Sequence, residues 1–256
     1  MGRVELGKIP GTAPGAVVFQ SLSPGFDLFD EARRATMSTR LESFDQMRAR
    51  VLTLLVPDAC HKLNNSVAVI SGMAELTMHS SGKVNSVDSL QLVFDHSRRV
   101  AKQLTRLSFF ALSTSLEIGV EDAGNAYADA AGLLTPIFEV TGTRFECESA
   151  ELTYPVKIDR RRLMQVLVVL ACCPLLPSDP DNFNFETQPK LETVRLSIGY
   201  SETGTAIEVG LPANCIREAE AAVELVRSTL AEFEAGVSVQ RQPNETVLRV
   251  SMNGIE

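Results

Sequence analysis

The feature that most constrains the fold is a regular apolar repeat after Pro57. Its members, at alternating intervals of four and three residues, are Leu63, Val67, Ile70, Ala74 and Thr77. Heptad-like spacing places these side chains in one stripe along a helix, and such a stripe packs against another helix. The sequence therefore predicts a long amphipathic helix with a helical partner.

A second helix with similar spacing follows the turn-forming residues Ser80-Ser81-Gly82. Its stripe comprises Leu90, Phe94, Ser97, Val100 or Ala101, Leu104, Leu107 and Ala111. Two amphipathic helices joined by a short turn form an antiparallel hairpin. Because one hairpin leaves apolar surface uncovered, we expect two copies to pair in a four-helix bundle, which makes the protein a homodimer.

Local composition and hydrophobic pattern divide the chain into three parts. Residues 1–25 are rich in Gly and Pro and lack a helical period, which is typical of a flexible arm. Residues 26–115 carry the helical pattern, as two helices or one kinked helix up to about residue 80 and then the second hairpin helix. Residues 116–256 mix helix-like and strand-like runs and are expected to form a separate α/β domain, so the fold class is α+β.

The α/β domain has a definite expected order of elements. They are a helix at 121–140, a strand at 144–149, a helix at 160–173, strands at 194–200 and 206–211 joined by Glu202-Thr203-Gly204, a helix at 216–235, and a final hairpin across Gln242-Pro243-Asn244.

Composition excludes several classes of protein. With 24 basic and 32 acidic residues the chain carries a net charge of −8, which disfavours nucleic acid as a partner. The five cysteines form no CxxC pair, so neither a disulfide framework nor a zinc site is indicated, and a cytoplasmic location fits best. The start of the chain does not resemble an export signal. The longest apolar run, 163–177, is shorter than the roughly 20 residues that cross a bilayer, so no membrane association is expected.

One of the three histidines lies in a suggestive context, Cys60-His61-Lys62-Leu63-Asn64-Asn65. At about 100° per residue, His61 points away from the seam residue Leu63, and Asn65 lies one turn further on the same face. An exposed imidazole beside an amide can do chemistry, although a solvated surface histidine is the other interpretation. Cys60 cannot serve as a nucleophile paired with His61, because adjacent helical side chains diverge.

Two stretches of the sequence resemble the bacterial two-component sensor histidine kinases. The segment 61–76, HKLNNSVAVISGMAEL, looks like their phosphoacceptor box, and the hairpin looks like their dimerisation and histidine-phosphotransfer domain. The segment 158–167, IDRRRLMQVL, resembles the approach to the asparagine box of their ATP-binding domain. Together the matches cover about residues 50–256 and imply a histidine-kinase-type α/β sandwich after the hairpin.

The sequence departs from this family where the family binds nucleotide. The two asparagines of the asparagine box align with Val169 and Cys173. The box that reads adenine aligns with 210–213, GLPA, which has no aspartate, and 217–222, REAEAA, lacks the glycines of the phosphate-covering lid. The resemblance therefore implies a degenerate ATPase-like domain, with no cofactor and no metal of its own.

The histidine box departs as well, because Lys62 stands where the family usually has Asp or Glu. Autophosphorylation is disfavoured by this change. Two interpretations of Lys62 stay open: its ammonium steadies an incoming phosphoryl group, or it is a solvent-facing residue at an inactive site.

The resemblance implies a phosphotransferase of the small phosphorelay type. His61 would accept a phosphoryl group from one response-regulator receiver domain and pass it to another, with Mg²⁺ held by the receiver. Asn65 would hydrogen-bond the receiver or position water. Expected partners are receiver domains, a second copy of the chain and a hybrid sensor kinase. The alternatives are a catalytically silent pseudokinase that acts as a scaffold or sequesters a regulator, and a divergent but active kinase.

Two charged segments are compatible with partner surfaces. A basic stripe on the second hairpin helix comprises Arg98, Arg99, Lys102 and Arg106, and residues 117–151 hold eight acidic residues and one Arg. A solvated face is the ordinary interpretation of each. The other interpretation of the basic stripe is a docking surface for an acidic receiver domain.

Overall fold

A computed structural model describes residues 43–79, 86–112, 117–148, 152–176, 191–202 and 204–254. All of them belong to one compact unit, residues 42–256. The expected flexible arm and the expected boundary between residues 115 and 116 lie outside the described residues. None of the helices within these ranges is both long and apolar enough to cross a lipid bilayer.

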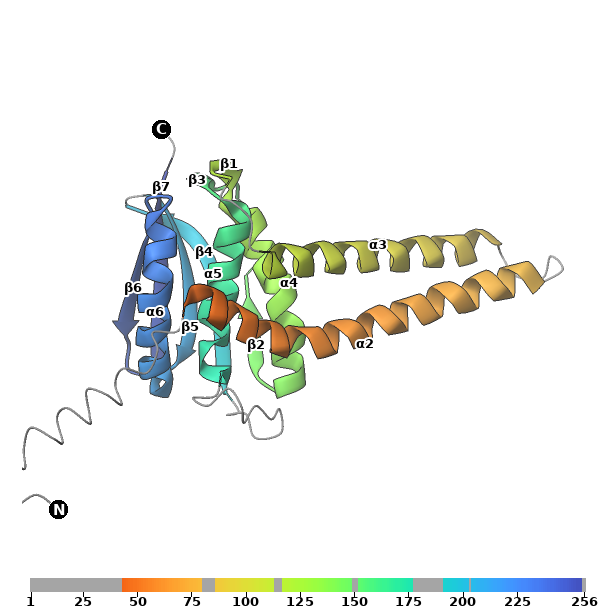
Figure 1. Ribbon diagram of the computed structural model, residues 1–256, viewed down its shortest axis with the longest axis horizontal. Helices are drawn as coiled ribbons and strands as arrows, with labels where there is room; N and C mark the ends of the chain where they lie inside the picture. The colour runs from red at the N-terminus through yellow and green to blue at the C-terminus, as the bar shows by residue number, and fades with distance from the viewer. Residues whose placement is uncertain are drawn as a thin grey trace, which may run out of the picture. The chain divides into compact units, whose positions relative to one another are not determined.

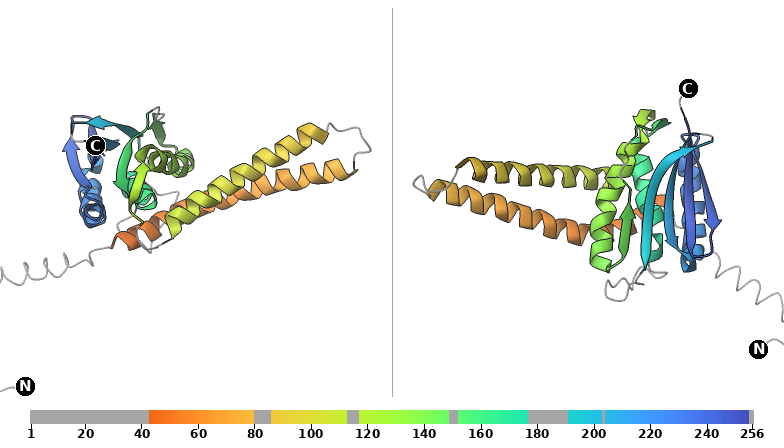
Figure 2. Two further views of the ribbon diagram at one scale, coloured as in Figure 1. Left: turned by 90° about the horizontal axis from the view of Figure 1, so that it is seen from above. Right: turned by 180° about the vertical axis from the view of Figure 1, so that it is seen from behind.

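Two long helices, α2 (Phe44–His79) and α3 (Ser86–Ala111), form a hairpin in which they lie side by side (Figure 1, Figure 2). A capping box starts α2: the Ser43 hydroxyl accepts from the Gln46 N–H at 3.2 Å, and the Gln46 carboxamide accepts from the Ser43 N–H at 2.8 Å. Pro57 lies inside this single helix. The predicted hairpin is confirmed, and its pairing with a second copy stays a prediction.

The rest of the described chain combines three helices with a mixed sheet. The helices are α4 (Ala123–Thr141), α5 (Arg160–Cys172) and α6 (Ile216–Ala231). The strands, in sheet order, are β2 (Arg144–Cys147), β4 (Thr193–Ser201), β5 (Gly204–Pro212), β7 (Glu245–Asn253) and β6 (Gly236–Arg241). Only β2 runs parallel to its neighbour, and the other pairs are antiparallel. The predicted α+β class is therefore confirmed.

The structure adds elements that the sequence did not predict. Strands β1 (Gly119–Asp122) and β3 (Pro155–Ile158) form a two-stranded antiparallel sheet. Single turns of 3₁₀ helix, Cys173–Leu175 and Ala213–Cys215, follow α5 and precede α6. The last predicted helix ends at Ala231 instead of residue 235, because Glu234 takes a left-handed conformation with φ 56°.

The core lies between the three helices and one face of the sheet (Figure 1). Alternate residues of the central strands are buried there: Val194 and Leu196 in β4, Ile207 and Val209 in β5, Leu248 and Val250 in β7. Helix α5 is buried at every position from Leu163 to Cys172. The longest apolar run of the sequence therefore forms a helix that is buried on all sides, unlike a surface helix with a single apolar stripe.

Side chains from α2 and α5 hold the end of α3. The Gln165 amide nitrogen donates to the carbonyls of Phe109 at 2.8 Å, Phe110 at 3.1 Å and Leu112 at 3.1 Å. The Arg48 guanidinium donates to Leu112 O at 2.8 Å and to Phe110 O at 3.3 Å. The last carbonyls of a helix have no N–H donor within the helix, so these buried carbonyls of α3 need hydrogen-bond donors from elsewhere. The α3 end cap, Arg48 and Gln165, thus fixes the hairpin to α5.

Candidate functional site

His61 lies on α2 with an exposed side chain. Its Nε2 atom is 3.1 Å from the side-chain amide nitrogen of Asn65. The two residues are four apart on one helix, which is the spacing that brings side chains of successive turns together. The structure therefore places the two predicted site residues in direct contact on an accessible face.

Lys62 makes contacts that the sequence did not predict. Its ammonium lies 3.3 Å from the Asp58 carboxylate, one turn earlier on α2, and 3.2 Å from the Glu139 carboxylate on α4. The Asp58 spacing is readable in the sequence as an i, i+4 pair, whereas Glu139 is 77 residues away. Lys62 is therefore half-buried and links α2 to α4, instead of standing free beside His61.

The predicted basic stripe on α3 is interrupted at Arg106. Its guanidinium pairs with Asp129 of α4 at 3.2 Å and donates to Ala128 O at 3.3 Å. Gly132 leaves the space that the Arg106 side chain occupies. Arg106 thus holds α3 against α4, and Asp129 of the acidic segment is a structural partner. Arg98 lies over the Phe94 ring, 5.6 Å from its centroid.

The residues aligned with the family's asparagine box are part of the core. Val169 is fully buried, and Cys173 is 3% exposed. Burial raises the pKa of the Cys173 thiol well above its ordinary value, so the sulfur stays protonated at neutral pH. A neutral thiol and a valine are not ligands for Mg²⁺, which requires oxygen. The residues at these positions do not fit a magnesium–nucleotide complex.

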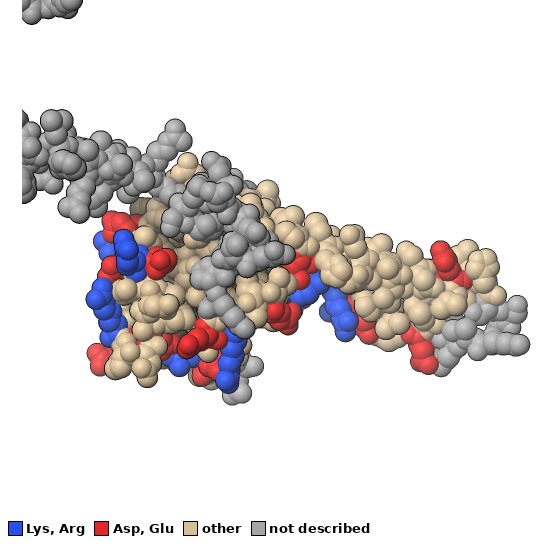
Figure 3. All heavy atoms as spheres, turned by 90° about the horizontal axis from the view of Figure 1, so that it is seen from below, with Lys and Arg blue, Asp and Glu red and all other residues tan. Residues whose placement is uncertain are grey.

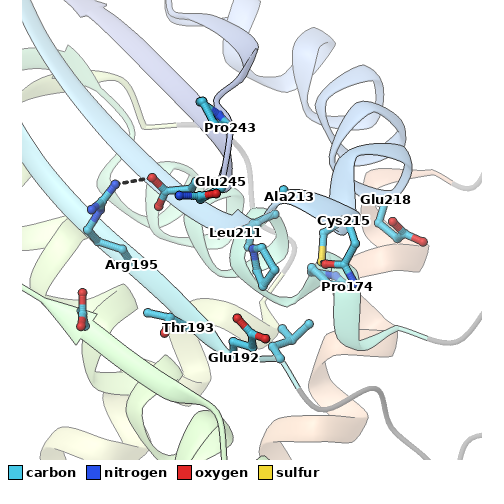
Figure 4. A pocket seen from close by; sticks show the side chains of 15 residues that line it. Pro174, Glu192, Thr193, Arg195, Leu211, Ala213, Cys215, Glu218, Pro243 and Glu245 are labelled. Atoms are coloured by element: carbon cyan, nitrogen blue, oxygen red, sulfur yellow. Dashed lines mark hydrogen bonds and ion pairs between the residues drawn. The ribbon is translucent and has the colours of Figure 1, made fainter.

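A cavity of about 740 Å³ lies where α5 and β5 end, beside the residues aligned with the nucleotide boxes (Figure 4). Four carboxylates line it: Glu146, Glu192, Glu218 and Glu245. Arg195 is the basic residue among the described lining, and Figure 4 shows it joined to Glu245. The Glu245 carboxylate crosses above Gly210, where a side chain would collide with it.

The charge of this cavity opposes a nucleotide. Four carboxylates against one guanidinium leave an excess of three negative charges, which repels a polyphosphate. Within the described ranges no group of three or more His, Cys, Asp and Glu side chains is arranged to hold a metal ion.

Part of the apolar stripe on α3 is exposed in the described chain. Leu90, Phe94 and Leu104 of the predicted stripe are 61%, 56% and 48% exposed, whereas Val100 and Leu107 are half-buried. Figure 3 shows that much of the visible hairpin surface carries neither acidic nor basic residues. The half of the stripe formed by Leu90, Phe94 and Leu104, termed the α3 apolar face below, is left uncovered by α2.

No protein-family model matches this sequence, and no curated protein matches it. Solved structures give weak similarity. A bacterial phosphotransferase is 15% identical over 78% of this chain and 95% of its own, with a TM-score of 0.32. The histidine kinase AdeS of Acinetobacter baumannii is 14% identical over 77% of this chain and 98% of its own, with a TM-score of 0.36. The histidine kinase ThkA, solved in complex with the response regulator protein TrrA, is 13% identical over 90% of this chain and 67% of its own, with a TM-score of 0.39.

Proposed function

We propose that the protein is a histidine phosphotransferase that relays a phosphoryl group between receiver-domain aspartates through His61, without binding ATP. The observation that carries this proposal is the exposed His61 imidazole with the Asn65 amide 3.1 Å from its Nε2 atom. The resemblance of segment 61–76 to a phosphoacceptor box supports the same assignment. Response-regulator receiver domains are the proposed partners, with a hybrid sensor kinase upstream.

The proposed reaction is a displacement at phosphorus. Nε2 of His61 attacks the phosphorus of an aspartyl phosphate, an N–P bond forms, and the P–O bond to the aspartate breaks so that the carboxylate leaves. The second receiver reverses these steps with its own aspartate. Mg²⁺ bound by the receiver offsets the charge on the transferring group. We assign Lys62 the role of positioning α4 beside the site, because its ammonium is already engaged by Asp58 and Glu139.

The degenerate nucleotide region supports a relay rather than a kinase. Val169 and Cys173 supply no metal ligand, and the acidic cavity disfavours a triphosphate. A relay protein needs neither, because the phosphoryl group arrives already activated on the donor receiver.

The α3 apolar face supports a homodimer. Leu90, Phe94 and Leu104 repeat at helical spacing along one side of the hairpin, and an exposed apolar stripe of this kind is typical of an association surface. Two hairpins joined along it would make the four-helix bundle.

The test is transfer of labelled phosphate from a panel of phosphorylated receiver domains to the purified protein. The wild type is compared with His61→Ala, with the matched control His79→Ala at the far end of α2, and with a lane that receives ATP alone. We expect acid-labile label on the wild type and on His79→Ala, and none on His61→Ala. Label from no donor would favour the scaffold, and label from ATP alone would show a divergent kinase.

A further inference from the structure

The contact between His61 and Asn65 constrains where the imidazole carries its proton. The atom of Asn65 that faces Nε2 is the amide nitrogen, which only donates hydrogen bonds. Nε2 must then accept with its lone pair, and in a neutral ring the single proton lies on Nδ1. We infer that Asn65 is a positioning residue that holds His61 in the Nδ1–H tautomer.

The other polar groups around His61 do not share this role. Residue 62 is a lysine and supplies no carboxylate, and Asp58 on the same helix lies 3.3 Å from the Lys62 ammonium. Glu139, from the neighbouring helix α4, binds the same ammonium. Among the described residues, Asn65 is the hydrogen-bond partner that the structure gives the imidazole.

The tautomer matters for phosphotransfer, and this consequence rests on the proposed function. A lone pair on Nε2 makes that nitrogen the nucleophile, whereas a proton on Nε2 blocks attack by it. During the reaction the Asn65 N–H releases Nε2 as the N–P bond forms and the electron pair of the P–O bond leaves with the receiver carboxylate. The Nδ1 proton stays on the ring during attack and passes to water afterwards.

The tautomer can be measured directly by ¹⁵N NMR of the full chain labelled at histidine. Spectra are recorded at a pH of about 8.5, where imidazoles are neutral. His79, exposed at the end of the same helix, serves as the internal reference. Because a net hydrogen bond shifts an equilibrium by about three- to tenfold, we expect the ratio of Nδ1–H to Nε2–H at His61 to exceed that at His79 by this factor.

Variants at position 65 separate hydrogen bonding from packing. Asn65→Ala should bring the ratio at His61 close to that of His79. Asn65→Asp, of nearly the same size but able only to accept, should favour Nε2–H. Asn64→Ala, at the exposed neighbouring position, should leave the ratio unchanged.

A ratio of Nδ1–H to Nε2–H at wild-type His61 no higher than that at His79 would overturn the inference, because the Asn65 amide would then not be donating to Nε2. An unchanged ratio in Asn65→Asp would overturn it as well. Neither result depends on phosphotransfer, since no receiver is present. Failure of the receiver assay with a confirmed Nδ1–H tautomer would instead reject the proposed function alone.

Discussion

At the scale of single residues, Gln165 is a polar side chain with a structural role in the core. Its side chain is 1% exposed in an otherwise apolar helix, and its amide donates to three carbonyls at the end of α3. Arg48 also donates hydrogen bonds to two of these carbonyls, Phe110 O and Leu112 O. Of the two residues in the α3 end cap, only Gln165 donates to Phe109 O. Buried carbonyls without donors are costly, which explains a glutamine at this position.

We expect Gln165→Ala to lower the free energy of unfolding by about 2–3 kcal/mol, because it removes the buried hydrogen bonds and leaves a cavity. Gln165→Glu keeps the shape but loses the N–H donors, and should be at least as destabilising. Chemical denaturation at neutral pH measures both. The control Gln91→Ala removes an exposed i, i+4 contact on α3 and should cost less than about 0.5 kcal/mol. Equal losses at positions 165 and 91 would show that the hydrogen bonds of Gln165 contribute nothing to the α3 end cap.

Helical periodicity was sufficient to predict that His61 and Asn65 share a face, because both lie on one continuous helix. The environment of Lys62 could not be predicted in the same way. Its second partner, Glu139, comes from another helix, and only the packing of α4 beside α2 brings the two charges together. Contacts between residues of one helix can be predicted from their spacing in the sequence, whereas ion pairs between elements depend on the tertiary arrangement.

At the scale of elements, the two apolar stripes of the hairpin illustrate what spacing does and does not determine. Spacing correctly predicted both helices, and burial divides the α3 stripe between a half-buried part, which includes Val100 and Leu107, and the exposed α3 apolar face. A periodic pattern shows that a face is apolar, but it does not say whether the same chain or another one covers it. Strands β1 and β3 were missed because each has four residues and contains residues that are rare in strands, Gly119 and Asp122 in β1 and Pro155 in β3.

If the α3 apolar face joins two hairpins, Phe94→Glu should convert the protein to a monomer. A carboxylate in the middle of a buried apolar interface is unfavourable, and Arg98 one turn later would offset only part of that cost, whereas on the 56% exposed position of a single chain it costs little. Analytical ultracentrifugation measures the change, and circular dichroism checks that the helices persist. Arg99→Glu introduces the same side chain on the opposite side of α3 and should leave the dimer intact. A dimer that survives Phe94→Glu would exclude this face.

At the scale of the whole molecule, burial of ionisable groups couples stability to pH. Cys215 is 4% exposed, and burial raises the pKa of its thiol from 9.0 to about 11. Burial also raises the pKa values of Cys172, Cys173 and Tyr127 above their ordinary values. The folded protein therefore holds protons that the unfolded chain releases as the pH rises past 9.

The sign of this linkage is fixed by the direction of the shifts. Below about pH 9 both states keep these protons, and the contribution to stability is complete. Between pH 9 and the raised pKa values the unfolded state binds fewer protons, so the free energy of unfolding should fall steadily.

Denaturation at pH 8, 9 and 10 measures the slope of the free energy of unfolding against pH. Cys215→Ser removes one titrating group from the core and should reduce the slope, whatever it does to stability at pH 8, while Cys60→Ser at an exposed site on α2 should not change it. A slope that is the same in Cys215→Ser and in the wild type would mean that the Cys215 thiol titrates alike in the folded and unfolded chains, and that the packing around α5 and α6 does not hold it protonated.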